Sequence, residues 1–166
     1  MIPMIFSEVR VTGVADTPVL LLREARGDRY LPVWISAAGA NAILSALEDA
    51  PDEHPASHDL IVALLAALGV VVDEVRIIDV VEGVFTAQMR VGEATVACRV
   101  SDGVAVALRC AAAISVSESV LDRAGTLVRP GDPGEGSDAQ MEQFRAFLDT
   151  LRPEDFDPGA GEGPQP

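Results

Sequence analysis

The chain of 166 residues contains no lysine, and all twelve of its basic residues are arginines. A P-loop needs a lysine that reaches the nucleotide phosphates, and Schiff-base or pyridoxal chemistry needs a lysine amine. These classes are therefore excluded. The patterns GxGxxG, GxSxG and paired CxxC are absent as well, so dinucleotide binding, serine hydrolysis and a cysteine zinc site have no support. We expect no organic cofactor.

Aromatic residues are scarce, at 4%, although 49% of the chain is hydrophobic. The core must therefore consist of Val, Leu, Ile and Ala around a few large side chains such as Trp34 and Phe85. No apolar run approaches the roughly 20 residues of a transmembrane helix, and the N-terminus lacks the basic segment of a signal peptide. We expect a cytoplasmic protein without membrane contact, in which Cys98 and Cys110 are buried thiols.

The charge is strongly one-sided, with a net value of −14. Affinity for nucleic acid comes mainly from basic side chains that displace counterions from phosphates, so a protein of this charge repels nucleic acid as a whole. A nuclease with this composition must act through a local site. A bound divalent cation or a cluster of arginines would offset the field there.

A duplicated pattern predicts the fold. Glu8-Val9-Arg10-Val11 recurs 66 positions later as Glu74-Val75-Arg76-Ile77, and two further strands and two helices follow each copy. We therefore expect an α+β domain made of two β-β-β-α-α units, in which residues 8–68 superpose on 74–124. The predicted strands are 8–11, 19–22, 31–35, 74–77, 85–89 and 95–98, and the predicted helices are 39–44, 58–68, 102–107 and 118–124.

Helix ends and the core follow from the same pattern. We expect Ser57, Ser101 and Ser117 to be N-caps, and Gly69 and Gly125 to follow the last turns of two helices. Equivalent inward positions of the repeat predict six buried side chains, namely Val33, Ile35, Val96, Cys98, Ala105 and Val106.

The composition changes near residue 129. We expect residues 1–128 to form the duplicated domain, and residues 129–136, which are rich in Gly, Pro and acids, to form a linker. Residues 137–152 follow as a C-terminal amphipathic helix, and residues 153–166 as a disordered acidic tail. Nine acids and two arginines lie beyond residue 130, so this appendix carries half of the net charge.

Four segments resemble the bifunctional nuclease (BFN) domain family, in order and with its spacings over about residues 6–128. They are Leu31–Ile35, His54–Leu60, Glu74–Asp79 and Arg99–Arg109. The C-terminal part from Glu142 to Phe156 is similar to that of actinobacterial members. The resemblance implies an intracellular, often dimeric protein with a duplicated α+β fold that hydrolyses both RNA and DNA.

The chain departs from the family pattern at several positions. Gly39 stands where the family usually has Glu, His54 replaces an Arg, Ser57 a Thr, Val100 a Pro and Gly103 an Ala. If the missing glutamate binds metal or moves protons, this chain is a weak or inactive member. The change from Thr to Ser at position 57 keeps the hydroxyl group.

The candidate catalytic residues lie at two helix starts. His58 offers acid–base chemistry beside Asp59, and Asp102 begins the equivalent helix of the second copy. If the pseudo-twofold symmetry brings these helix starts together, Asp59 and Asp102 share a divalent ion, Mg²⁺ or Mn²⁺. The alternative is that both carboxylates only stabilise helix N-termini and that His58 lies on the rim.

Two arginines are candidates for binding phosphate. Arg99 and Arg109 can each present a guanidinium to a phosphate, and Arg109 lies seven residues after Asp102, on the same helix face. Alternatively, Arg109 pairs with a carboxylate near the end of its helix. Ser57, Ser101 and Gly39 are expected to shape the site.

Two hypotheses of different classes follow. The first is a metal-assisted phosphodiesterase that acts on RNA or DNA, with nucleic acid as its substrate. The second is a non-catalytic interaction or regulatory module that kept the fold and lost the glutamate. In either case the high apolar content of a small domain predicts a twofold homodimer.

Overall fold

The structure is a computed structural model, which describes residues 1–11, 17–48 and 55–127. The described residues form seven strands and four helices, which confirms the predicted α+β class. The expected linker, C-terminal helix and acidic tail lie outside the described residues. The elements are β1 (Ile2–Val11), β2 (Pro18–Glu24), β3 (Tyr30–Trp34), α1 (Ala37–Ser45), α2 (Ser57–Ala67), β4 (Glu74–Val81), β5 (Val84–Val91), β6 (Ala94–Cys98), α3 (Val100–Cys110), β7 (Ala113–Val116) and α4 (Glu118–Ala124).

The strands form one sheet in the order β3-β2-β1-β7-β4-β5-β6. Within each half the strands are antiparallel, and β7 joins the halves by pairing antiparallel with β1 and parallel with β4. The second half therefore contains one strand more than the sequence predicted. β7 has only four residues, Ala113–Val116, which is too short for its alternation to be recognised. Superposition of the halves stays a prediction.

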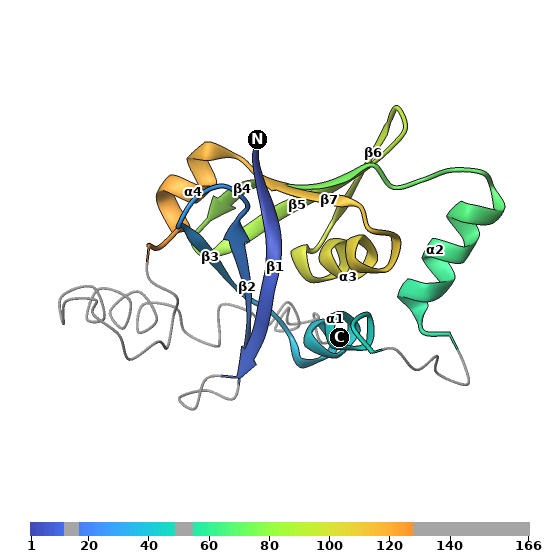
Figure 1. Cartoon of the computed structure of the whole chain (residues 1–166), viewed down its shortest axis with the longest axis horizontal. Helices are drawn as coiled ribbons and strands as arrows, with labels where there is room; N and C mark the ends of the chain where they lie inside the picture. The colour runs from blue at the N-terminus through green and yellow to red at the C-terminus, as the bar shows by residue number, and fades with distance from the viewer. Residues whose placement is uncertain (12–16, 49–54, 128–166) are drawn as a thin grey trace, which may run out of the picture. The chain divides into compact units, whose positions relative to one another are not determined.

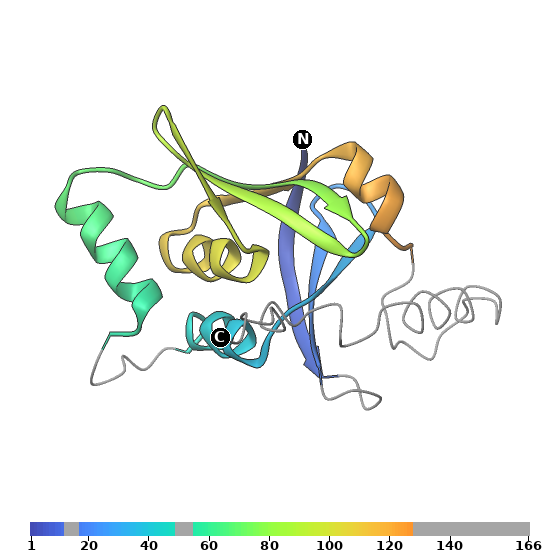
Figure 2. The ribbon, with the colours of Figure 1, turned by 180° about the vertical axis from the view of Figure 1, so that it is seen from behind.

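The helices α1 and α3 lie side by side on one face of the sheet (Figures 1 and 2). Seven of the eleven residues of α3 are buried, which makes it the central helix of the domain. α2 packs against α3 but contains no buried residue, and α4 lies at the opposite end of the sheet, against β4. None of the described helices is both long and apolar enough to cross a bilayer.

The core lies between the sheet and the helices. Its fully buried side chains include Leu20, Leu22, Leu31, Ile43, Val75, Ile77, Val104 and Leu121. Four of the six predicted core residues, Val33, Ile35, Ala105 and Val106, are buried. Cys98 is half-buried, and the prediction for Val96 is wrong, because its side chain is 48% exposed. The reason is that β6 forms the end of the sheet, so β5 is its only strand neighbour.

Two of the three predicted serine N-caps are wrong. Ser117 does cap α4, since its hydroxyl accepts a hydrogen bond from the Val120 N–H. Ser57, however, is already the first residue of α2, and Ser101 is the buried second residue of α3. Both helices begin earlier than the serine pattern predicted, and the cap position of α3 is Arg99.

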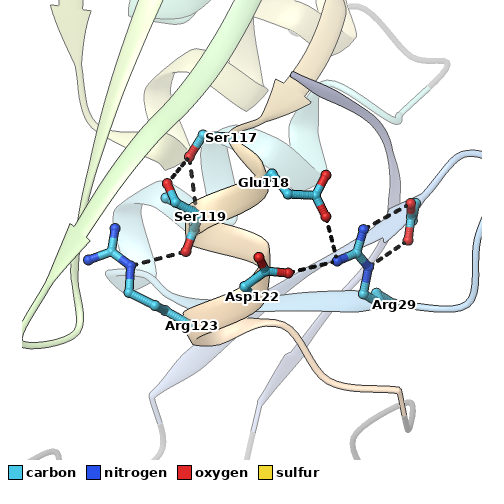
Figure 3. A network of polar contacts seen from close by, with 8 residues as sticks. Arg29, Ser117, Glu118, Ser119, Asp122 and Arg123 are labelled. Atoms are coloured by element: carbon cyan, nitrogen blue, oxygen red, sulfur yellow. Dashed lines mark hydrogen bonds and ion pairs between the residues drawn. The ribbon is translucent and has the colours of Figure 1, made fainter.

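Two arginines hold α4 against both halves of the sheet. Arg29, in the connection between β2 and β3, contacts Glu118 and Asp122 of α4 at 3.0 and 3.1 Å (Figure 3). On the other side, Arg123 of α4 donates to Asp79 of β4 at 2.6 Å. α4 therefore links the two halves at the end of the sheet away from α2.

Position 39 has no room for a side chain. A Cβ placed on Gly39 would lie 2.7 Å from the Cβ of Ser101, closer than real Cβ contacts allow. Gly39 and Ser101 are both buried, and α1 and α3 lie close together at this pair of small residues. The glutamate that the resemblance implies at this position would require the two helices to separate.

Gly39→Ala is expected to lower the free energy of unfolding by about 1–3 kcal/mol, because the added methyl group overpacks the contact between α1 and α3. Ser101→Gly in the same chain removes the clashing Cβ and should recover part of the loss. Urea denaturation of the single and double variants measures both effects. Ala38→Ser, at an exposed position of α1, is the control and should change stability by less than about 0.5 kcal/mol. Unchanged stability of Gly39→Ala would contradict the packing argument.

Candidate functional site

The first turns of α2 and α3 meet and bring two predicted site residues into contact. His58 Nε2 lies 3.1 Å from Asp102 Oδ1, although the residues are 44 positions apart in sequence. Their side chains are 17% and 29% exposed, so the pair is partly shielded yet open to solvent. Because both helix N-termini point their N–H groups towards this corner, the corner favours negative charge.

Asp102 is held in place by Arg99. The guanidinium binds both carboxylate oxygens, with Nε to Oδ2 at 2.6 Å and Nη2 to Oδ1 at 3.1 Å. Burial alone would raise the pKa of Asp102, but the hydrogen bonds from Arg99 and His58 outweigh burial and lower this pKa below its ordinary value. Asp102 is therefore a carboxylate at neutral pH.

An ionised carboxylate only accepts hydrogen bonds, which fixes the proton of His58. Nε2 must carry the hydrogen that it donates to Asp102, so in the neutral ring Nδ1 is left with a lone pair. Asp102 thus orients the His58 ring, and Nδ1 has no hydrogen-bond partner among the described residues.

A second ion pair lies next to the first and is built differently. The Arg109 side chain is only 7% exposed, and its Nε donates to Asp59 Oδ1 at 2.5 Å. Its other nitrogens bind the carbonyl oxygens of Ala42 and Ala105 at 2.7 and 2.9 Å, and Ser45 Oγ at 2.9 Å. Arg109 therefore ties α1, α2 and α3 together.

Asp59 also serves the start of its own helix. Its Oδ2 accepts a hydrogen bond from the Ala56 N–H at 2.9 Å, which satisfies a backbone group at the N-terminus of α2. The hydrogen bond from Arg109 lowers the pKa of Asp59; burial opposes this shift, and the Ala56 N–H adds to it. Both of the roles left open for Asp59 and Arg109, helix stabilisation and carboxylate pairing, are thus present in the structure.

The predicted site residues fall into two groups. His58, Asp102 and Arg99 converge at a partly exposed corner. The guanidinium of Arg109 instead donates its hydrogen bonds to buried or partly buried acceptors of the protein. Among the shaping residues, Ser101 and Gly39 form the contact between α3 and α1, and Ser57 is exposed. Sequence reasoning missed the contributions of Ser45 and of the Ala42 carbonyl, which no motif marks.

The donors do not form a site for a divalent metal ion. Among the described residues, no group of three His, Cys, Asp or Glu side chains is placed to hold a metal. The two predicted ligands are both engaged, Asp59 by Arg109 and Asp102 by Arg99 and His58. Residues 1–11, 17–48 and 55–127 therefore provide no ready site for Mg²⁺ or Mn²⁺, and the proposed mechanism uses side chains alone.

Comparison with known proteins agrees with the motifs. The family model of the bifunctional nuclease domain matches residues 20–129, a range that contains every candidate site residue. Two uncharacterized proteins of Mycobacterium tuberculosis, one from each of two strains, are 44% identical to the chain over 159 residues. The alignments cover 90% of this chain and 97% of each relative. The chain belongs to the bifunctional nuclease domain family.

Arg109→Ala is expected to lower the free energy of unfolding by about 3 kcal/mol, because it leaves Asp59 and the Ala42 carbonyl without their partner. Arg109→Lys should keep only part of this stability, since an ammonium cannot reach three helices at once. Chemical denaturation measures both variants. The matched control is Arg99→Ala, whose exposed ion pair should contribute less than about 1 kcal/mol. Equal losses for Arg109→Ala and Arg99→Ala would contradict the structural role of Arg109.

Asp59 also predicts a pH dependence. A carboxyl group whose pKa is lowered on folding stabilises the protein above its unfolded pKa, near 4, and this contribution disappears as the pH falls through the folded pKa. The difference in stability between the wild type and Asp59→Asn should therefore be largest near neutral pH and shrink in acid. Urea unfolding at a series of pH values tests this. A difference that grows below about pH 4 would contradict the assignment.

Proposed function

We propose that the chain hydrolyses phosphodiester bonds of nucleic acid, with His58 as the group that moves the proton. The observation that supports this proposal is the chain of contacts from His58 to Asp102 to Arg99 at an accessible corner. Membership of the bifunctional nuclease domain family supports the reaction class. Asp59 and Arg109, which were candidates for catalysis and phosphate binding, act here as positioning residues.

In this mechanism the free Nδ1 of His58 takes a proton from the attacking water. The water oxygen forms a bond to phosphorus, the ester bond to the leaving oxygen breaks, and that oxygen takes the proton from the imidazolium. Asp102 holds the ring in the required tautomer and stabilises the imidazolium in between, as a carboxylate does beside a catalytic histidine. Arg99 keeps Asp102 ionised and oriented.

The substrate phosphate needs local positive charge. The Arg99 side chain is 70% exposed, and its Nη1 makes no hydrogen bond within the described residues. Nη1 and the N-termini of α2 and α3 are the groups proposed to face the phosphate. Because the net charge of −14 opposes long polyanions, we propose short or single-stranded RNA or DNA as the substrate.

Two further expectations accompany this proposal. The dependence on Mg²⁺ or Mn²⁺ expected from the sequence is not part of this mechanism, and the assay below tests it with a chelator. A cytoplasmic location also stays a prediction from the sequence. We propose that the working form is a homodimer, because β6 leaves exposed apolar surface for a second copy, including the half-exposed side chain of Val96.

A non-catalytic interaction or regulatory module is the second candidate function. The observation that favours it is α2, which has no buried residue although it carries no charge after Asp59. A helix of this kind is suited to binding a protein rather than a phosphate. Gly39, where the family usually has a glutamate, favours the same alternative.

His58→Asn should lower the rate of cleavage by roughly 10²–10⁴-fold, because an amide cannot exchange the proton. Asp102→Asn should lower the rate as well, since the amide can orient the ring but cannot stabilise the imidazolium. Purified protein is assayed on single-stranded RNA and DNA oligonucleotides with Mg²⁺, with Mn²⁺ and with chelator. Ala67→Ser, at the exposed last residue of α2, is the control and should cleave at the wild-type rate.

The outcomes separate the candidates. Cleavage by His58→Asn at the wild-type rate would reject the proposed base. Loss of cleavage with chelator would show that a metal takes part and would reject catalysis by side chains alone. Absence of cleavage by the wild type under every condition would reject the enzyme and favour the interaction module.

A further inference from the structure

Within the described part of the chain, no strand covers the outer edge of β6. It closes one end of the sheet, and its side chains Ala94, Thr95, Val96 and Ala97 are all exposed. The strand contains no charge and no proline, and it has no lysine to discourage pairing. Proteins usually block such edges, because the open backbone groups bind another strand. The opposite edge strand, β3, contains Pro32, which is one of these blocks.

The hairpin fixes which backbone groups of β6 point outward. Val91 pairs with Ala94 across the two-residue turn Gly92-Glu93, and residues flanking such a turn exchange both hydrogen bonds. The bonded positions then alternate, so the N–H and C=O of Val96 also face β5. The same groups of Thr95 and Ala97 face the open edge.

The outward backbone groups of β6 can form hydrogen bonds with the same groups of β6 in a second copy of the chain. In an antiparallel pair centred on Val96, Thr95 of one copy stands opposite Ala97 of the other, and both present outward backbone groups. Two residues further along, the turn residue Glu93 stands opposite Arg99 in this register. Arg99 keeps an extended backbone, with φ −70° and ψ 149°, so the strand direction continues to it.

Other registers fit less well. Pairs centred on Thr95 or on Ala97 also match outward groups, but they place Glu93 or Arg99 opposite an uncharged residue. The register centred on Val96 pairs all five residues of β6 and joins opposite charges at both ends. Opposite charges directly across antiparallel strands are favourable, and like charges are unfavourable.

We propose that β6 pairs antiparallel with β6 of a second copy of this chain, about a twofold axis at Val96, so that one sheet continues through both copies. This inference rests on the homodimer proposed above and names its interface. It also connects the interface to the candidate site. The partner subunit's Glu93 lies opposite Arg99 in this register. The Nε and Nη2 atoms of Arg99 already donate hydrogen bonds to Asp102.

Val96→Lys tests the axis. Two lysines would face each other across the twofold axis, so the variant should be monomeric at micromolar concentrations where the wild type is a dimer. Sedimentation equilibrium gives the masses, and circular dichroism checks folding. Thr95→Pro is a second variant, because it removes an outward N–H and no hydrogen bond to β5, and it should also be monomeric. The matched control is Leu64→Lys on α2, which is 54% exposed and should remain dimeric.

A charge exchange tests the register. Glu93→Arg and Arg99→Glu should each weaken the dimer by roughly tenfold, because each places like charges opposite each other at both ends of β6. A mixture of the two variants restores both opposite-charge contacts and should form a heterodimer as tight as the wild type. A wild-type monomer, a dimeric Val96→Lys or a monomeric Leu64→Lys would overturn this interface. Failure to restore the dimer by mixing would overturn the register. Cleavage by the wild type is scored separately, so these outcomes do not depend on the catalytic proposal.

Discussion

The arrangement of the helices depends on one buried guanidinium. Arg109 projects from the last turn of α3 and reaches a carboxylate of α2, a carbonyl and a hydroxyl of α1, and a carbonyl of its own helix. α2 has no buried side chain of its own, so few apolar contacts fix its position. The charge-assisted bond to Asp59 compensates, because it anchors the first turn of α2 beside α3. That anchor sets the position of His58, the residue before Asp59.

The candidate site consequently has balanced charges although the protein as a whole is acidic. At the corner formed by α2 and α3, two arginines and two helix N-termini balance two carboxylates, whereas the chain as a whole carries −14. Positive charge is local, and most of it is committed to holding side chains. Among the described residues, Arg99 Nη1 and His58 Nδ1 are the groups at this corner that have no protein partner. The proposed mechanism assigns both to one phosphodiester group rather than to a long duplex.

Much of the fold could be predicted from the sequence, because strand alternation and helical stripes are local signals. The first six strands and the four described helices overlap their predicted ranges, although β1 begins at Ile2, six residues before its predicted start, and β7 was too short to show a period. Val96 was misplaced because alternation reports the side of a sheet and not what covers it. Ser57 and Ser101 were misread because helices can begin before their first serine. The contact between His58 and Asp102 depends on how α2 meets α3, and no local pattern encodes this.

The position of β7 in the sheet has a consequence for how the chain folds. β7 is the last of the described strands to be synthesised, yet it lies in the middle of the sheet, where it pairs with Ile2–Met4 near the N-terminus and with Glu74–Ile77. Until residue 116 has left the ribosome, the two hairpin-rich halves have no strand to join them. The sheet therefore closes through contacts between residues far apart in sequence, which fold slowly compared with local ones. A nascent or truncated chain that ends before β7 would expose two open edges, on β1 and β4, and would be prone to pair with other chains.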